Sequence, residues 1–111
     1  MIVKELSESL NLSVLCGDTD REIDGVYTGD LLSWVMSRLT ENKVWITIMS
    51  NINVIAVASL ADAACVILAE GVEPDADALE AAKTKGVTLL SSDLDAYSLC
   101  VKIARLTGDT Q

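Results

Sequence analysis

Three short runs of apolar residues constrain the fold most strongly. They cover residues 44–48, 64–68 and 87–90, and apolar side chains follow one another there with little polar alternation. A strand buried on both faces has this pattern, whereas a strand with one face in water alternates apolar and polar residues. Segments long enough for helices, 51–60 and 74–85, separate the runs. The chain is therefore predicted to form βαβ units with a mainly parallel sheet.

The rest of the chain extends this pattern. Val3, Leu6 and Leu10 recur at helical spacing, which predicts an amphipathic helix over 3–10. We also expect strands at 12–16 and 23–27, a helix over 31–39, and a last helix that begins at Ser92 and Asp93 and runs to 104. A chain of 111 residues has the length of one compact domain. The prediction is a single α/β domain over 1–111, a three-layer α/β/α fold with a mainly parallel sheet of about five strands.

Residues 52–60 are compatible with two structures. Their valine and isoleucine content suits a strand as well as a helix, and periodicity does not separate the two. A strand here would need a tight antiparallel return to Ala64, so packing favours a helix.

Charge and composition exclude several functions. Seventeen acidic residues against eight basic ones give a net charge of -9, which opposes binding to nucleic acid or anionic membranes. Histidine is absent, and with it the commonest general base and zinc ligand. Cys16, Cys65 and Cys100 are widely spaced in apolar surroundings, which predicts buried free thiols in a reducing cytoplasm. We expect no catalytic residue, no metal and no cofactor.

Small polar residues follow four of the predicted strands. In a parallel sheet, ligands bind beyond the carboxyl ends of the strands, so these residues form a candidate ligand-binding rim. The alternative is that several of them, Thr28, Asp30, Asn51, Ser92 and Asp93, only cap helices. Asp30 and Asp93 would repel a phosphate there unless a metal or Arg21 offset their charge. The predicted ligand-binding residues are Thr28, Gly29, Asp30, Asn51, Asn53, Gly71, Ser91, Ser92 and Asp93.

Two features point to self-association. Trp34 lies off the apolar stripe of its predicted helix, and tryptophan is enriched at subunit interfaces. Segment 52–60, read as a helix, is apolar on more sides than one sheet face can cover. An isologous dimer is the simplest closed outcome. Both Trp34 and Trp45 are also compatible with a place in the core.

Four stretches carry a resemblance to a known family. They are residues 25–36 (GVYTGDLLSWVM), 51–58 (NINVIAVA), 66–71 (VILAEG) and 87–93 (VTLLSSD). In this order they resemble a stand-alone DRTGG domain, although the literal string Asp-Arg-Thr-Gly-Gly is absent. Related domains occur in CBS-domain pyrophosphatases, in certain phosphotransacetylases and as the N-terminal domain of HPr kinase/phosphorylase. The resemblance implies an α/β/α fold, a homodimer and a regulatory or ligand-sensing role.

These observations lead to one function and one alternative. The resemblance implies a non-enzymatic, homodimeric regulatory domain that senses a small ligand such as an adenine nucleotide. The alternative is a protein-interaction subunit that docks on a larger enzyme complex and binds no small molecule. A small hydrolase or transferase using Asp30, Asp93 or Cys100 is the weakest interpretation, because the chain has no histidine and no GxxxxGK[ST] phosphate loop.

Overall fold

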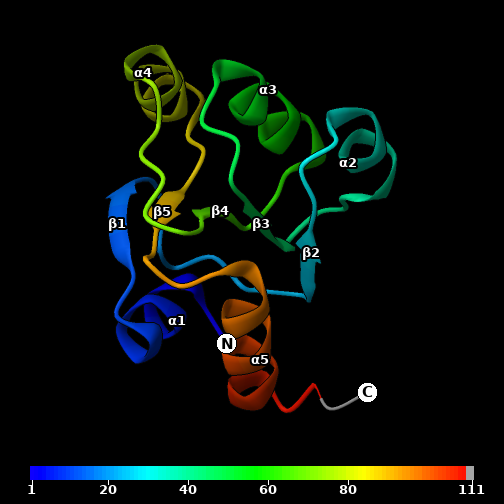
Figure 1. Cartoon of the computed structure of the whole chain (residues 1–111), viewed down its shortest axis with the longest axis vertical. Coiled ribbons are helices and arrows are strands. Elements are labelled where there is room, and N and C mark those ends of the chain that lie inside the picture. The colour runs from blue at the N-terminus through cyan, green and yellow to red at the C-terminus, as the bar shows by residue number, and fades with distance from the viewer. Residues whose placement is uncertain (110–111) are drawn as a thin grey trace.

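The computed structural model describes residues 1–109, in which helices and strands follow one another along most of the chain (Figure 1). The helices are α1 (Val3–Leu10), α2 (Leu32–Arg38), α3 (Ile52–Ala61), α4 (Ala76–Lys85) and α5 (Ala96–Thr107). The strands are β1 (Ser13–Cys16), β2 (Val26–Thr28), β3 (Val44–Thr47), β4 (Cys65–Leu68) and β5 (Leu89–Ser91).

The five strands form one sheet in the order β1-β5-β4-β3-β2. Strands β2, β3, β4 and β5 run parallel to one another, whereas β1 pairs with β5 in the antiparallel direction, with Ser13 opposite Ser91. The predicted mainly parallel sheet of about five strands is thus confirmed. The antiparallel edge strand has one further effect, because it brings the turn before β1 to the edge where β5 ends.

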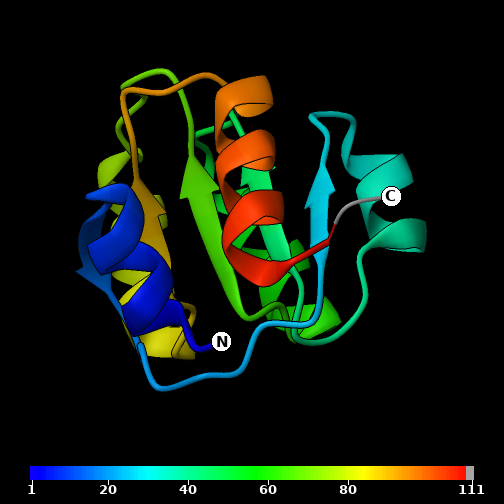
Figure 2. The ribbon, with the colours of Figure 1, turned by 90° about the horizontal axis from the view of Figure 1, so that it is seen from below.

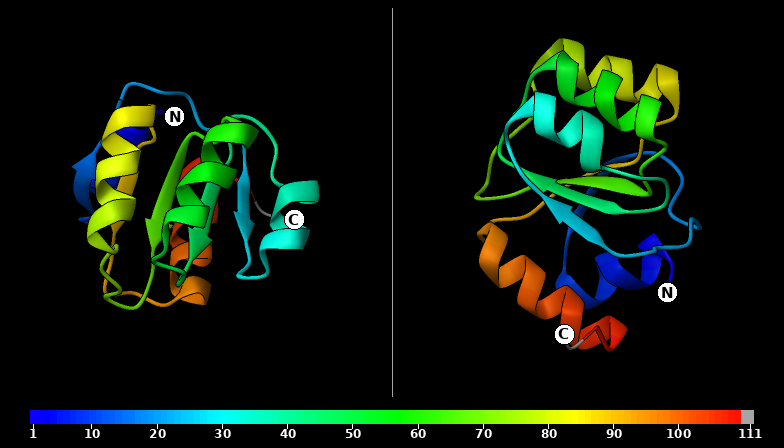
Figure 3. Two further views of the ribbon diagram at one scale, coloured as in Figure 1. Left: turned by 90° about the horizontal axis from the view of Figure 1, so that it is seen from above. Right: turned by 90° about the vertical axis from the view of Figure 1, so that its right-hand side faces the viewer.

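Helices cover both faces of the sheet and make three layers. The crossovers from β2 to β5 all advance in the same direction across the sheet, and right-handed connections then place α2, α3 and α4 on one face. Helices α1 and α5 pack on the other face (Figures 2 and 3). The predicted α/β/α architecture is confirmed.

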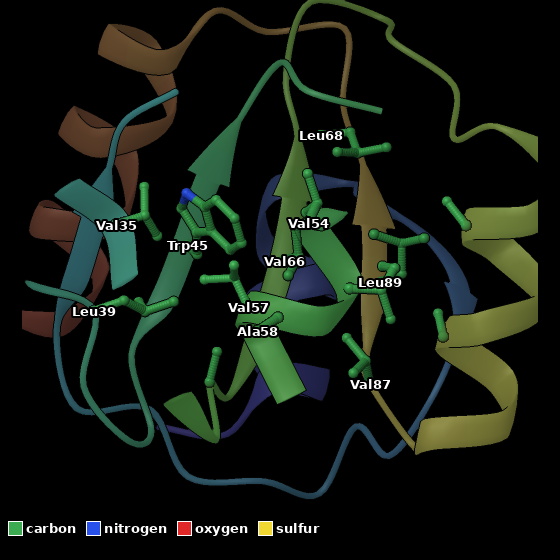
Figure 4. Close-up of a cluster of buried hydrophobic side chains, with 14 residues drawn as sticks. Val35, Leu39, Trp45, Val54, Val57, Ala58, Val66, Leu68, Val87 and Leu89 are labelled. Carbon is green, nitrogen blue, oxygen red and sulfur yellow. The ribbon is translucent and has the colours of Figure 1, made fainter. Parts of the chain in front are cut away.

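Each face of the sheet has its own apolar core. On the side of α2 to α4, the core includes Trp45, Val54, Val66 and Leu89, all almost fully buried (Figure 4). On the opposite side, α1 and α5 pack on residues such as Ile67. All four residues of β3 and of β4 are buried, which explains why these strands are continuously apolar in sequence.

Residues 52–60 are helical, as packing favoured. The side chain of Asn51 accepts a hydrogen bond from the Asn53 amide at 2.9 Å and caps α3, and Asp62 ends the helix in the left-handed conformation. Helix α3 contacts α2 on one side and α4 on the other, with the sheet beneath it. The helix buries Val54, Ile55, Val57 and Ala58 but leaves Ile52 and Leu60 exposed, so apolar residues lie on its solvent side as well and its sequence lacks a clear amphipathic period.

Three local expectations were wrong. The second strand begins at Val26, because Gly25 adopts a positive φ of 92° and Ile23 bonds to the backbone near the N-terminus. The last helix has Asp95 as its N-cap, so Ser92 and Asp93 lie in the preceding turn. Of the three free thiols, only Cys65 is buried, since Cys16 and Cys100 lie at the margins of the core.

The length and composition of the helices show whether any of them could span a membrane. Among residues 1–109, every helix is too short or too polar to cross a bilayer.

Candidate functional site

The carboxyl ends of β2, β3, β4 and β5 all open at one edge of the sheet, because these strands are parallel. The predicted ligand-binding residues therefore lie along one edge, as the rim hypothesis requires. They do not form a single cluster, however, since the strand order spreads their turns across the width of the sheet.

A hollow of about 340 Å³ lies at the ends of β4 and β5. The chain leaves β4 toward α4 on one face of the sheet and leaves β5 toward α5 on the other face. The two turns diverge, and such a point is where open α/β sheets bind ligands. The hollow is lined by Asn11, Ser13, Gly71, Val72, Glu73, Ser91, Ser92 and Asp93.

A second hollow of about 350 Å³ adjoins the first and shares Asn11, Ser92 and Asp93 with it. It extends along α1 and α5 and adds the exposed cation Lys102.

Backbone hydrogen bonds hold the two turns in place. The amides of Glu70 and Gly71 donate to the carbonyls of Leu94 and Ser92, each at 2.8 Å. Within its own turn, the Ser92 hydroxyl accepts from the Leu94 amide at 3.1 Å. Gly71 has a φ of 72°, and a Cβ built on it would lie 3.2 Å from Oδ1 of Asp93. Glycine therefore suits this position both for its conformation and for the close approach of Asp93.

The predicted residues after β2 have structural partners instead of lining a hollow. The Asp30 carboxylate accepts hydrogen bonds from the Thr47 hydroxyl at 2.7 Å and from the Ile48 amide at 3.0 Å. The Gly29 carbonyl accepts from the indole N–H of Trp45 at 3.0 Å. Asp30 thus ties the turn after β2 to the end of β3.

The capping interpretation was correct for Asn51 alone. Helix α2 has Leu31 as its N-cap with no side-chain hydrogen bond, so neither Thr28 nor Asp30 caps it. Ser92 and Asp93 do not cap α5. Of the nine predicted residues, four line the hollow, namely Gly71, Ser91, Ser92 and Asp93, whereas Thr28, Gly29, Asp30, Asn51 and Asn53 line neither hollow.

Sequence reasoning missed four lining residues, namely Val72 and the polar residues Asn11, Ser13 and Glu73. Asn11 and Ser13 reach this edge because β1 is antiparallel to β5, and no local pattern indicated that direction. Glu73 lies two residues after the predicted site residue Gly71, so its position in the same loop was an available signal.

A further hollow, of about 470 Å³, lies elsewhere, between the amino end of β2 and α5. None of the nine predicted residues lines it. Arg21 is also remote from the rim, since it pairs with Asp62 at 2.9 Å and bonds to the side chain of Asn42, just before β3. No three His, Cys, Asp or Glu side chains of residues 1–109 are grouped so that they could share a metal ion.

The two tryptophans have different environments. Trp45 is fully buried in the core, whereas Trp34 is 56% exposed on α2. Leu31 and Met36 are also exposed there, and the guanidinium of Arg38 lies 3.9 Å from the centroid of the Trp34 ring. Helix α2 buries one of its seven residues, Val35, and therefore presents an apolar surface to solvent.

Comparisons with known proteins agree with this architecture. One solved structure contains the CBS and DRTGG domains of the regulatory region of Clostridium perfringens pyrophosphatase, in complex with the activator diadenosine tetraphosphate. It superposes with a TM-score of 0.68 at 12% sequence identity, and the match covers 87% of this chain and 43% of that one. At this identity the likeness establishes the fold, and the chain spans less than half the length of its structural neighbour. No curated protein matches in sequence. The family model of the DRTGG domain matches residues 3–106, and the chain therefore belongs to the DRTGG domain family.

Proposed function

We propose that this chain is a non-enzymatic regulatory domain that senses a small ligand, such as an adenine nucleotide, and acts as a homodimer. Family membership supports the regulatory role. The adenine dinucleotide in the complex of the structural neighbour supports the ligand class. The whole chain, 1–111, would act as one domain, and its free thiols suit a reducing cytoplasm.

The observation that carries the proposal is the polar hollow at the ends of β4 and β5. It has a volume at the lower end of those that hold small ligands, and the diverging turns around it are held by backbone hydrogen bonds. Such a site is preformed, so a ligand would not have to order it on binding.

The geometry also argues against an acid–base couple of Asp30 and Asp93. Asp30 is bonded to residues at the end of β3, and Asp93 lies after β5, with β4 between these two strands. The two carboxylates therefore belong to separate parts of the rim.

Helix α2 supports the proposed homodimer. Leu31, Trp34 and Met36 are large apolar side chains that are more than half exposed, and the guanidinium of Arg38 lies over one face of the Trp34 ring. Tryptophan and arginine are the residues most enriched where interfaces gain their affinity. The same surface favours the second candidate function, a subunit that docks on a larger enzyme complex.

Thermal unfolding with adenosine, AMP, ATP and diadenosine tetraphosphate tests the sensing role. A ligand at a hundred times its dissociation constant stabilises the folded state by about 2.7 kcal/mol, a shift of roughly 10 °C in a chain of this size. Replacing two lining serines together, Ser13→Ala with Ser91→Ala, should abolish the shift. A control pair on the exposed helix faces, Ser33→Ala with Ser59→Ala, should keep it. An unchanged melting temperature with every ligand, together with capture of a partner enzyme, would favour the docking subunit.

A further inference from the structure

The chemistry of the hollow at the ends of β4 and β5 indicates which part of a ligand it accepts. We infer that it binds the vicinal hydroxyl groups of a nucleoside or nucleotide ribose and leaves any phosphate groups outside, in solvent. This inference rests on the proposed ligand-sensing function and specifies its ligand.

The charges around the hollow oppose a phosphate. Its lining includes the carboxylates of Glu73 and Asp93 and no lysine or arginine. Among the residues that line the two hollows, Lys102 is the one cation, and it lines the adjoining hollow. Arg21, which could have offset the carboxylates, is paired with Asp62 away from this rim. The net charge of -9 adds to the repulsion of an anion.

Most of the backbone donors that a phosphate would need at these turns are already used; the amides of Glu73 and Asp93 have no acceptor within residues 1–109, but each of these residues also carries a carboxylate. Phosphate sites in α/β folds rely on free N–H groups at the start of helices and in turns. Here the Gly71 amide donates to the Ser92 carbonyl and the Ser92 amide to the Leu68 carbonyl. The Val72 amide donates to a carbonyl in its own turn, and the Leu94 amide to the hydroxyl of Ser92.

The side chains that remain are suited to hydroxyl groups. In residues 1–109, no hydrogen bond involves the side chains of Asn11, Ser13, Glu73, Ser91 or Asp93. A carboxylate accepts two hydrogen bonds from adjacent hydroxyls, and serine and asparagine side chains both donate and accept. In dinucleotide-binding folds a carboxylate after a strand binds the ribose hydroxyls in the same way, and a basic residue takes its place where a phosphate must be accommodated.

The experiment is a titration of the isotope-labelled protein, followed by the amide signals in two-dimensional NMR, with adenosine, 2′-deoxyadenosine, ATP and D-ribose. Adenosine should shift the amides of Asn11, Ser13, Gly71 and Asp93. At about 0.01 M salt, ATP should bind about tenfold more weakly than adenosine. This difference should narrow at about 0.15 M, where the Debye length falls from about 30 Å to about 8 Å. Loss of one hydroxyl in 2′-deoxyadenosine should weaken binding about tenfold. D-ribose reports whether the sugar alone suffices or the base adds affinity, and both results support the assignment.

Asp93→Asn provides the sharpest variant, because Asp93 is exposed and makes no hydrogen bond that folding requires. This variant should bind adenosine about tenfold more weakly, and its affinity for ATP should be closer to its affinity for adenosine. Asp77→Asn on α4 makes the same change in net charge away from both hollows and should alter neither affinity.

Two results would overturn the inference. If ATP binds more tightly than adenosine at low salt, or shifts signals only elsewhere in the protein, the sugar assignment fails while nucleotide sensing stands. If no compound shifts any signal, both the sugar assignment and the proposed sensing role fail.

Discussion

Asp30→Ala should destabilise the fold without affecting ligand binding. The carboxylate of Asp30 accepts one hydrogen bond from the Thr47 hydroxyl and one from the Ile48 amide. Hydrogen bonds to a charged group contribute about 1.5–3 kcal/mol each, and the exposure of Asp30 favours the lower value. The Thr47 side chain is nearly buried, so its hydroxyl would also lose its acceptor. We expect a loss of about 2–3 kcal/mol, which lowers the melting temperature by roughly 8–12 °C.

Urea unfolding of Asp30→Ala beside Asp20→Ala measures this effect. Asp20 is exposed, and its carboxylate makes none of the hydrogen bonds found for Asp30. A double-mutant cycle with Thr47→Val isolates the pair and should give a coupling energy of more than about 0.5 kcal/mol. If Asp30→Ala and Asp20→Ala unfold within about 0.5 kcal/mol of each other, Asp30 does not hold the two turns together. Asp30 would then be free of a structural role, and its prediction as a ligand-binding residue would have to be tested again.

Three further results are expected. Trp34→Ser should raise the dissociation constant of the proposed dimer about thirtyfold in light scattering, as for an interface residue that contributes 2 kcal/mol, and a monomeric parent protein would refute the dimer. Gly17→Ala should destabilise by about 3 kcal/mol or more, because φ is 102° and a Cβ would lie 2.3 Å from Cα of Thr88. Gly86→Ala should lower the free energy of unfolding by only about 1 kcal/mol, because φ is 71° but a Cβ built there would have no neighbour within 4 Å. Burial raises the pKa of the Cys65 thiol from 9.0 to about 12, so the unfolded chain ionises first as the pH rises. Stability should then fall between these values by up to about 1.4 kcal/mol per pH unit, a slope that is reduced in Cys65→Ala.

Local patterns were sufficient for most of the elements. Strands β3 and β4 are buried along their whole length, so burial on both faces appears directly as an apolar run. The end of helix α4 was recognisable from Gly86, but the helix was expected from Pro74 and begins two residues later, because Asp75 is its N-cap. Helix α2 was located correctly, but its capping was not, because the carboxylate of Asp30 bonds across to another strand and not to the adjacent helix.

The candidate site was only partly accessible to sequence reasoning. Placing polar residues at the ends of parallel strands located Gly71, Ser91, Ser92 and Asp93, since the position after a strand is a local property. The same rule also selected Thr28 and Asn53, which line neither of the two hollows there. What separates the two groups is whether neighbouring turns diverge: the turns after β4 and β5 lead to opposite faces of the sheet, whereas those after β2 and β3 lead to the same face.

Local patterns in the chain predicted the elements, their order and the mainly parallel sheet, because apolar periodicity and turn residues act over a few neighbouring positions. The antiparallel direction of β1 against β5 and the placement of α4 and α5 on opposite faces arise from tertiary packing. These long-range arrangements bring Asn11 and Ser13 beside Asp93 and open the hollow between the diverging turns. They depend on the packing of whole layers, which no short stretch of sequence encodes.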